Sequence, residues 1–170
     1  MNDYTNAPST KMLATHCAVC NRPLRDAVSV DLGIGPDCRK KHGYDIQVSE
    51  ESRTEANTLI HTIACDRKSP SVAVSIARIR DLGFAQLATT LETRIASVII
   101  SKEADGSYTM TTPYNESFVG AFRKVQGRRW DGQLKVTRFP EASKQEAWGV
   151  IKAHFQGHFL AHPRGGLVLI

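Results

Sequence analysis

The sequence predicts an α+β protein made of a small loop-rich unit, a helical middle unit, and a small β-sheet with helices on one face. Three observations predict it: cysteines gather in a glycine-rich N-terminal segment, apolar residues recur at helical spacing in the middle, and strand signals alternate with helix signals towards the C-terminus. The expected domains are a flexible N-terminus at 1–13, the loop-rich unit at 14–47, the helical unit at 48–95 and the αβ module at 96–170.

The loop-rich unit has too few periodic apolar positions to fold without a staple. Cys17 and Cys20 form a CxxC pair, Cys38 follows after 17 intervening residues, and His42 lies four positions beyond Cys38. This spacing predicts one Zn²⁺ held by Cys17, Cys20, Cys38 and His42. A closed shell of four ligands leaves no position for a reactive water, so the predicted site is structural. His16 and Cys65 are alternatives to His42 as the fourth ligand.

This segment also carries a longer pattern, formed by Cys17–Leu24 with its Pro-Leu, then Ser29, then Gly-Ile-Gly-Pro-Asp-Cys at 33–38. The pattern resembles a short zinc-knuckle module found in phage and bacterial proteins of undefined role. The resemblance implies a structural zinc site. We expect both Gly33 and Gly35 to adopt backbone conformations closed to other residues, which would turn Cys38 towards the metal. The basic run at 39–41 either contacts phosphate or is simply solvated.

Three helices are expected in the middle unit. Apolar residues at helical spacing predict the first from about Ser49 to Cys65, Ser69-Pro70 predicts the start of the second with Gly83 as its stop, and the third covers 84–95.

The C-terminal module reads as β-β-α-β-α with a possible last strand. Strands are expected at 96–102 and 107–112 around Asp105-Gly106, at 134–139 and at 167–170. Asn115 predicts the start of a helix that ends at Gly127, and a second helix is expected at 143–155.

The charge of the chain favours a polyanionic partner, since the formal net charge is +5 and the pI is about 9.2. Between positions 123 and 144 seven basic residues face two acidic ones, which concentrates the excess in the αβ module. The predicted phosphate contacts are Arg123, Arg128, Arg129, Lys135 and Arg138. Trp130 is a candidate for stacking on an unpaired base, with a place in the core as its alternative, as for Phe139. Arg128 and Arg129 are expected in a loop.

The same region resembles the HARP-type domain. The residues that carry this resemblance are Tyr114-Asn115-Glu116, Phe118, Phe122, 127–131, 135–136 and 139–140. That resemblance implies structure-selective binding of DNA, with a preference for forked or single-strand-containing forms. Thr137 stands where the family usually has a tryptophan. The sequence has no phosphate-binding loop of the kind a helicase motor needs.

Other classes of function are less well supported by the sequence. No segment predicts a signal peptide or a membrane span, so a cytoplasmic protein of a bacterium or a phage-infected host is expected. No base is paired with a nucleophile, so no enzymatic activity is expected. His154, His158 and His162 recur every four residues, but Gly157 and Pro163 interrupt the spacing, so surface histidines are favoured over a metal site. The alternative function is a phage-type factor that inhibits a host defence or replication protein through the helical unit; the sequence leaves the oligomeric state open.

Overall fold

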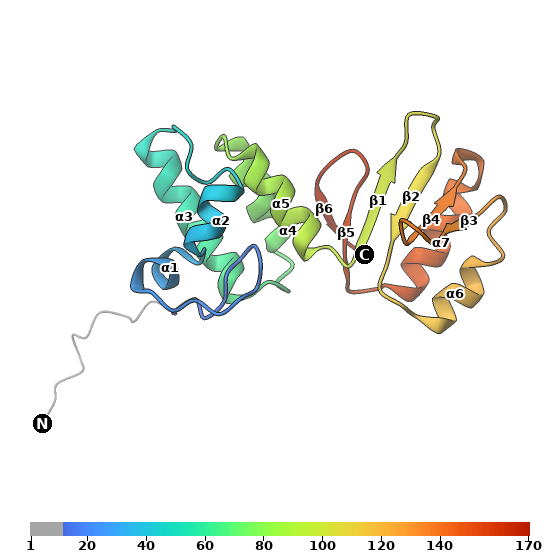
Figure 1. Ribbon diagram of the computed structural model, residues 1–170, viewed down its shortest axis with the longest axis horizontal. Coiled ribbons are helices and arrows are strands. Elements are labelled where there is room, and N and C mark those ends of the chain that lie inside the picture. The colour runs from blue at the N-terminus through green and yellow to red at the C-terminus, as the bar shows by residue number, and fades with distance from the viewer. Residues whose placement is uncertain (1–11) are drawn as a thin grey trace, which may run out of the picture. The chain divides into compact units, whose positions relative to one another are not determined.

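The computed structural model describes residues 12–170 and divides into two compact units, one up to Leu87 and one from Ala88 onward (Figure 1). Residues 1–11 of the predicted flexible N-terminus lie outside the described residues. None of the helices described over 12–170 has the length and apolar character needed to cross a membrane. The finer division into the loop-rich unit, the helical unit and the αβ module stays a prediction.

The first unit contains the predicted helices of the middle segment. These are α3 (Glu50–Cys65), α4 (Val72–Asp81) and α5 (Ala85–Ile95), the last of which crosses the unit boundary. The Ser49 hydroxyl accepts a hydrogen bond from the Ser52 N–H at 3.2 Å and caps α3. The apolar positions that predicted the helices supply the core, in which Ile60, Ile63, Ile76, Ile79, Phe84 and Leu87 are fully buried.

Two short helices in the loop-rich segment were not predicted. They are α1 (Ala27–Leu32) and α2 (Pro36–Lys41), each six residues long. Asp26 caps α1 by accepting a hydrogen bond from the Ser29 N–H at 2.9 Å, and Pro36 occupies the first position of α2, where its fixed φ suits a helix. Caps therefore define these helices where apolar periodicity does not.

The expectation for the two glycines of this segment is correct for one and wrong for the other. Gly33 ends α1 in the left-handed region, with φ of 75°, as expected. Gly35 has φ of −74° and ψ of 160°, an ordinary extended conformation that other residues adopt freely. The turn that presents Cys38 therefore depends on Gly33.

The second unit is built on a six-stranded sheet with the order β3-β4-β2-β1-β5-β6 (Figure 1). Its strands are β1 (Val98–Lys102), β2 (Tyr108–Thr111), β3 (Arg129–Asp131), β4 (Val136–Phe139), β5 (Phe159–Ala161) and β6 (Leu167–Leu169). Neighbouring strands are antiparallel except for β1 and β5, which are parallel. The hairpin expected around Asp105 is confirmed: the Asp105 carboxylate accepts a hydrogen bond from the Ser107 N–H at 2.8 Å.

The strands β3 and β5 were not predicted. Both have three residues, too few for a pattern of alternation to be visible in the sequence. The expectation of a loop at Arg128 and Arg129 is thus wrong for Arg129, which begins β3.

Two helices cover one face of this sheet, as predicted. They are α6 (Glu116–Phe122) and α7 (Lys144–His154), the latter preceded by a 3₁₀ turn, η1 (Glu141–Ser143). Asn115 caps α6 by accepting from the Phe118 N–H at 3.0 Å, but the helix ends at Phe122, five residues before the predicted Gly127. Side chains from sheet and helices share one core: Val98, Ile100, Tyr108, Met110, Phe118, Phe122, Val125, Phe139, Ala147, Ile151, Phe155 and Leu160.

Candidate metal centre and nucleic-acid interface

Three of the predicted metal ligands come together in the first unit. The thiol sulfurs of Cys17, Cys20 and Cys38 all lie within 4.8 Å of one another. Thiolates bound at about 2.3 Å to a tetrahedral zinc ion are separated by about 3.8 Å, so the three sulfurs need only a small adjustment to share one ion. The donor set and its spacing therefore fit a thiolate-binding metal.

The backbone around the CxxC pair forms a tight turn. The Cys17 N–H donates to the Arg22 carbonyl at 2.9 Å, and the Asn21 N–H donates to the Cys17 carbonyl at 2.9 Å. Asn21 adopts the left-handed conformation that this turn needs, with φ of 57°. The Ala18 N–H donates to the Gly33 carbonyl at 2.8 Å, which joins the turn to the end of α1 and so to α2, where Cys38 lies.

The thiols differ in their tendency to ionise. Burial raises the pKa of the Cys17 thiol, but hydrogen bonds from the backbone of Cys20, Gly35 and Val19 outweigh burial and hold that pKa below its ordinary value. Burial, followed by the charge of Cys17, raises the pKa of Cys38 to about 12. A metal ion that binds all three sulfurs must therefore displace a proton from Cys38 at neutral pH.

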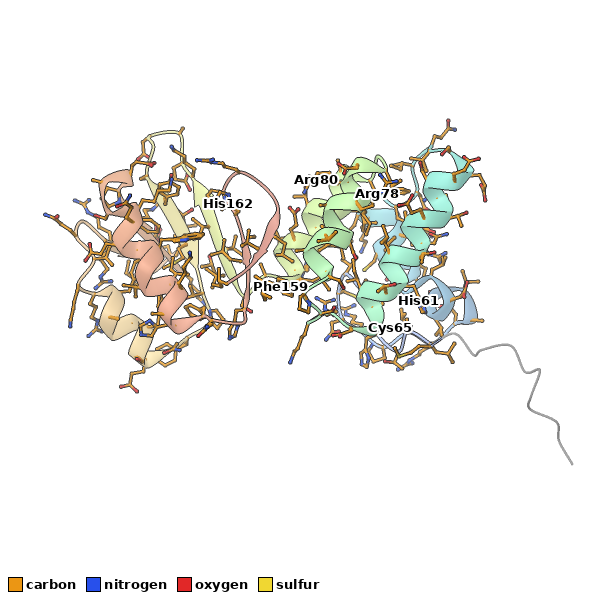
Figure 2. All side chains as sticks on the ribbon, turned by 180° about the vertical axis from the view of Figure 1, so that it is seen from behind. His61, Cys65, Arg78, Arg80, Phe159 and His162 are labelled. Atoms are coloured by element: carbon orange, nitrogen blue, oxygen red, sulfur yellow. The ribbon has the colours of Figure 1, made fainter. Side chains whose placement is uncertain are left out.

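The fourth ligand stays a prediction. His42 caps the C-terminus of α2, one helical turn after Cys38, and its ring nitrogens lie outside the group formed by the three sulfurs. Of the alternatives, His16 is exposed with its Nδ1 3.0 Å from the Thr15 hydroxyl. Cys65 lies on α3 beside His61, with its sulfur 3.8 Å from the His61 Nδ1 (Figure 2).

Arg67 contacts the turn that carries Cys17 and Cys20 and was missed by the sequence analysis. Its guanidinium donates to the carbonyl of Cys17 at 3.2 Å and to that of Ala18, so it holds the CxxC turn from the segment after α3. Burial lowers the pKa of Arg67, while the charges of Cys17 and Cys20 raise it less. Fifty positions separate Arg67 from Cys17, and no local pattern links them.

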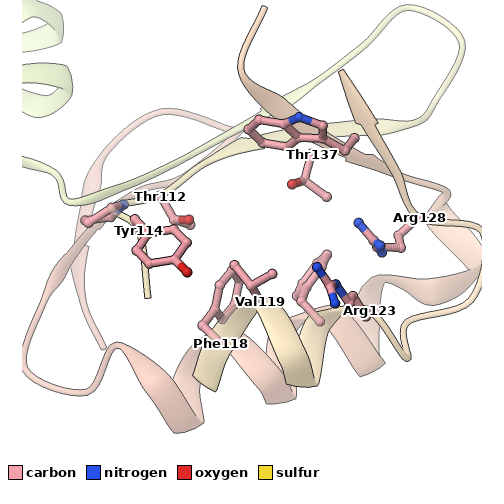
Figure 3. A pocket seen from close by; sticks show the side chains of 10 residues that line it. Thr112, Tyr114, Phe118, Val119, Arg123, Arg128 and Thr137 are labelled. Atoms are coloured by element: carbon pink, nitrogen blue, oxygen red, sulfur yellow. The ribbon is translucent and has the colours of Figure 1, made fainter. Parts of the chain in front are cut away.

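The second unit contains a pocket of about 480 Å³ between the start of α6 and the β3 end of the sheet. It is lined by Thr112, Pro113, Tyr114, Phe118, Val119, Phe122, Arg123, Arg128, Trp130 and Thr137. Figure 3 shows Thr112 and Tyr114 at one end, Arg123 and Arg128 at the other, and Phe118 and Val119 of α6 between them. The lining therefore has an aromatic end and a basic end.

Strand pairing decides which predicted residues reach this pocket. Trp130 pairs with Thr137, which also pairs with Met110, so this row lies on the sheet face that carries the buried Met110 and the helices. Arg129 pairs with Arg138 in the adjacent row, which points to the opposite face.

Of the six predicted nucleic-acid contacts, three line the pocket: Arg123, Arg128 and Trp130. Arg138 forms an ion pair with Asp131 at 3.6 Å on the other face, and the exposed Lys135 lies in the turn between β3 and β4 with φ of 55°.

The aromatic residues also differ in whether a ligand can reach them. Trp130 is 60% exposed and Tyr114 is 85% exposed, whereas Phe139 is in the core at 3%. Trp130 is therefore available to a ligand. Phe139 packs between Tyr108, at 5.4 Å between ring centroids, and Phe122, at 5.8 Å.

The three evenly spaced histidines do not form a group. The His154 ring lies 2.8 Å from the Val150 carbonyl, His158 contacts the Ser97 hydroxyl at 3.1 Å, and His162 packs edge-on against Trp148. Within residues 12–170, the three cysteines are the group of potential metal ligands that the structure brings together.

Comparison with known proteins gives one match, in the first unit. Residues 7–43 match a family of unknown function, DUF6011. No curated protein and no solved structure matches the chain. The matched stretch contains Cys17, Cys20 and Cys38, so the segment that is similar to this family is also the segment that carries the cysteine cluster.

Proposed function

We propose that this protein binds DNA that contains unpaired bases, through the pocket of the second unit, and that a structural zinc ion stabilises the first unit. The observation that carries the proposal is the lining of the pocket, where the exposed rings of Tyr114 and Trp130 occur together with the guanidinium groups of Arg123 and Arg128. Binding without catalysis is the proposed activity.

The chemistry of this lining suits a single strand. A base stacked on an aromatic side chain contributes about 1–3 kcal/mol whatever its identity, and arginine pairs with phosphate through parallel hydrogen bonds. Among the described residues, those that line the pocket include no acidic side chain that would repel phosphate. Such a surface recognises the phosphate backbone and unpaired bases, and it does not distinguish one base sequence from another.

A fork is the preferred substrate in this proposal, in agreement with the HARP-type resemblance of the sequence. Arg129 and Arg138 point to the other face of the sheet, and the exposed Lys135 lies in the turn beside them. The cations on the face of β3 and β4 opposite the pocket would contact phosphates of a duplex arm while the pocket holds the unpaired strand.

The proposed metal is Zn²⁺, held by Cys17, Cys20 and Cys38, with His42 as the proposed fourth ligand. Cys38 and His42 are four positions apart across the end of α2, so they lie on one side of that helix. Zinc favours thiolate and imidazole ligands in tetrahedral sites, and a closed shell contributes to folding. The segment has two helices of only six residues each, which fits a need for a metal staple.

Fluorescence anisotropy with labelled single-stranded, duplex and forked DNA at several salt concentrations tests the proposal. We expect the fork to bind most tightly, with the logarithm of affinity falling linearly with log salt. Replacing Arg123 and Arg128 by alanine should reduce the salt slope by about 1.4, since each phosphate contact on a single strand contributes about 0.7. Trp130→Ala should weaken binding about tenfold or more and leave the slope unchanged.

The variant Arg129→Ala/Arg138→Ala removes the same charge from the opposite face. It should weaken binding to the fork and spare binding to the single strand. Absence of binding to all three DNA forms at low salt would refute the proposal and favour the alternative, a factor that binds a host protein.

A further inference from the structure

We infer that the pocket recognises a nucleic-acid end that carries a terminal phosphate, with the last nucleotide inside the pocket and its phosphomonoester between Arg123 and Arg128. The inference rests on the proposed function and goes beyond it, since it names the part of the strand that the pocket takes.

The first step concerns the basic end of the pocket. Arg123 follows the last residue of α6, Arg128 immediately precedes β3, and Figure 3 shows both side chains at the same end of the cavity. Within residues 12–170, neither guanidinium group has an ion pair or a hydrogen bond to another side chain. Two neighbouring positive charges therefore lack a counterion from the described part of the chain.

The second step compares charges. An internal phosphodiester carries a single negative charge, whereas a phosphomonoester carries about −1.5 to −2 near pH 7 and offers three acceptor oxygens. Two arginines present two planar forks of donors, and each fork can bind two oxygens in parallel. The match in charge and in number of donors is thus better for a terminal phosphate than for a diester.

The third step concerns the size and polarity of the pocket. Its volume of about 480 Å³ falls in the range of pockets that enclose one small molecule. The aromatic ring of Tyr114 lies at the end opposite the arginines, with the apolar Phe118 and Val119 between (Figure 3). A single nucleotide has the same order of parts: a flat base that stacks on the ring, and a phosphate that reaches the arginines.

The test uses one 12-nucleotide single strand with an internal fluorophore, made with a 5′-phosphate, with a 3′-phosphate, or with hydroxyl groups at both ends. We expect one phosphorylated form to bind about tenfold more tightly than the hydroxyl-ended strand. The variant Arg123→Gln/Arg128→Gln should abolish this difference. Both positions are accessible to solvent, and a circular dichroism spectrum like that of the wild type would confirm that the variant folds.

A matched control removes two exposed cations that do not line the pocket, Lys124→Gln/Arg164→Gln. This control should keep the tenfold preference. Equal affinity for phosphorylated and hydroxyl-ended strands, with binding still dependent on Trp130, would overturn the inference and leave the proposed function intact. Absence of binding to every strand would overturn both.

Discussion

Replacing Gly33 by alanine tests how the end of α1 fits against α3. Gly33 has φ of 75°, and a Cβ at this position would lie 2.8 Å from the Cβ of Ala64 and 2.8 Å from the Cα of His61. Gly35, two positions on, provides the matched control, because it has an ordinary backbone conformation and a Cβ there would lie 3.5 Å from the nearest atom, Cδ2 of Leu24.

The expected magnitude follows from two separate effects. The left-handed conformation costs an L residue about 1–2 kcal/mol, and a methyl group forced into a packed interface costs about 1–3 kcal/mol. Gly33→Ala should therefore destabilise the first unit by about 2–5 kcal/mol, a large part of the stability of a small unit. Gly35→Ala should change stability by less than about 1 kcal/mol, since the gain in chain stiffness offsets a slightly poorer helix cap.

Two optical signals separate the units in the assay. Both tryptophans, Trp130 and Trp148, belong to the second unit, while α3 and α4 of the first unit contribute to the helical circular dichroism. The helices α6 and α7 of the second unit also contribute to the helical signal. In urea denaturation with saturating zinc, Gly33→Ala should therefore shift only the first unit's part of the helical transition to lower urea and leave the tryptophan transition in place. Equal midpoints for Gly33→Ala and Gly35→Ala would refute the reasoning about the α1–α3 contact.

Three further predictions concern the metal centre and the second unit. Arg67→Ala should weaken zinc affinity about 10–100-fold in a competition assay with a chromogenic chelator, because its guanidinium holds the CxxC turn; Lys68→Ala, an exposed neighbour, should have no effect. Zinc affinity should fall as pH falls from 8 to 6, because the metal must displace the proton of Cys38, whose pKa is raised to about 12; an affinity independent of pH would contradict this. Hydrogen bonds from the Tyr108 hydroxyl and Lys102 lower the pKa of Glu141 to about 2. The stability that the Glu141 carboxylate contributes is therefore present above its ordinary pKa of 4.5 and is lost as the pH falls towards 2. Tryptophan-monitored unfolding should show this loss in the wild type, and Glu141→Gln should remove that part of the pH dependence.

The elements that could be predicted are those whose signal lies in a short stretch of sequence. Helices α3, α4 and α5 bury a regular apolar face, so their periodicity is visible. The helices α1 and α2 bury little and depend on caps, so they show no apolar period. The strands β3 and β5 have three residues each, too few to show an alternation, and β5 also depends on β1, which is distant in the sequence.

The residues of the candidate sites also differ in whether a local sequence pattern reveals them. The CxxC pair and Cys38 could be read from the sequence because all three cysteines lie in one segment, with a spacing typical of small zinc modules. Arg67 could not, because only the tertiary fold brings it to the turn. Arg128 and Arg129 are neighbours that looked equivalent, yet the start of β3 at Arg129 leaves Arg128 at the pocket and turns Arg129 to the opposite face.

The parallel pairing of β1 with β5 has a consequence for the kinetics of folding. Val98 pairs with Leu160, 62 positions later, and both are fully buried in the core of the second unit. Closing a loop of this length is slow compared with forming the β1–β2 hairpin, so we expect the hairpin to form early and the core to close late. On the ribosome, the edge of β1 that pairs with β5 would remain unpaired until β5 has been synthesised. During this interval the nascent chain is most exposed to aggregation.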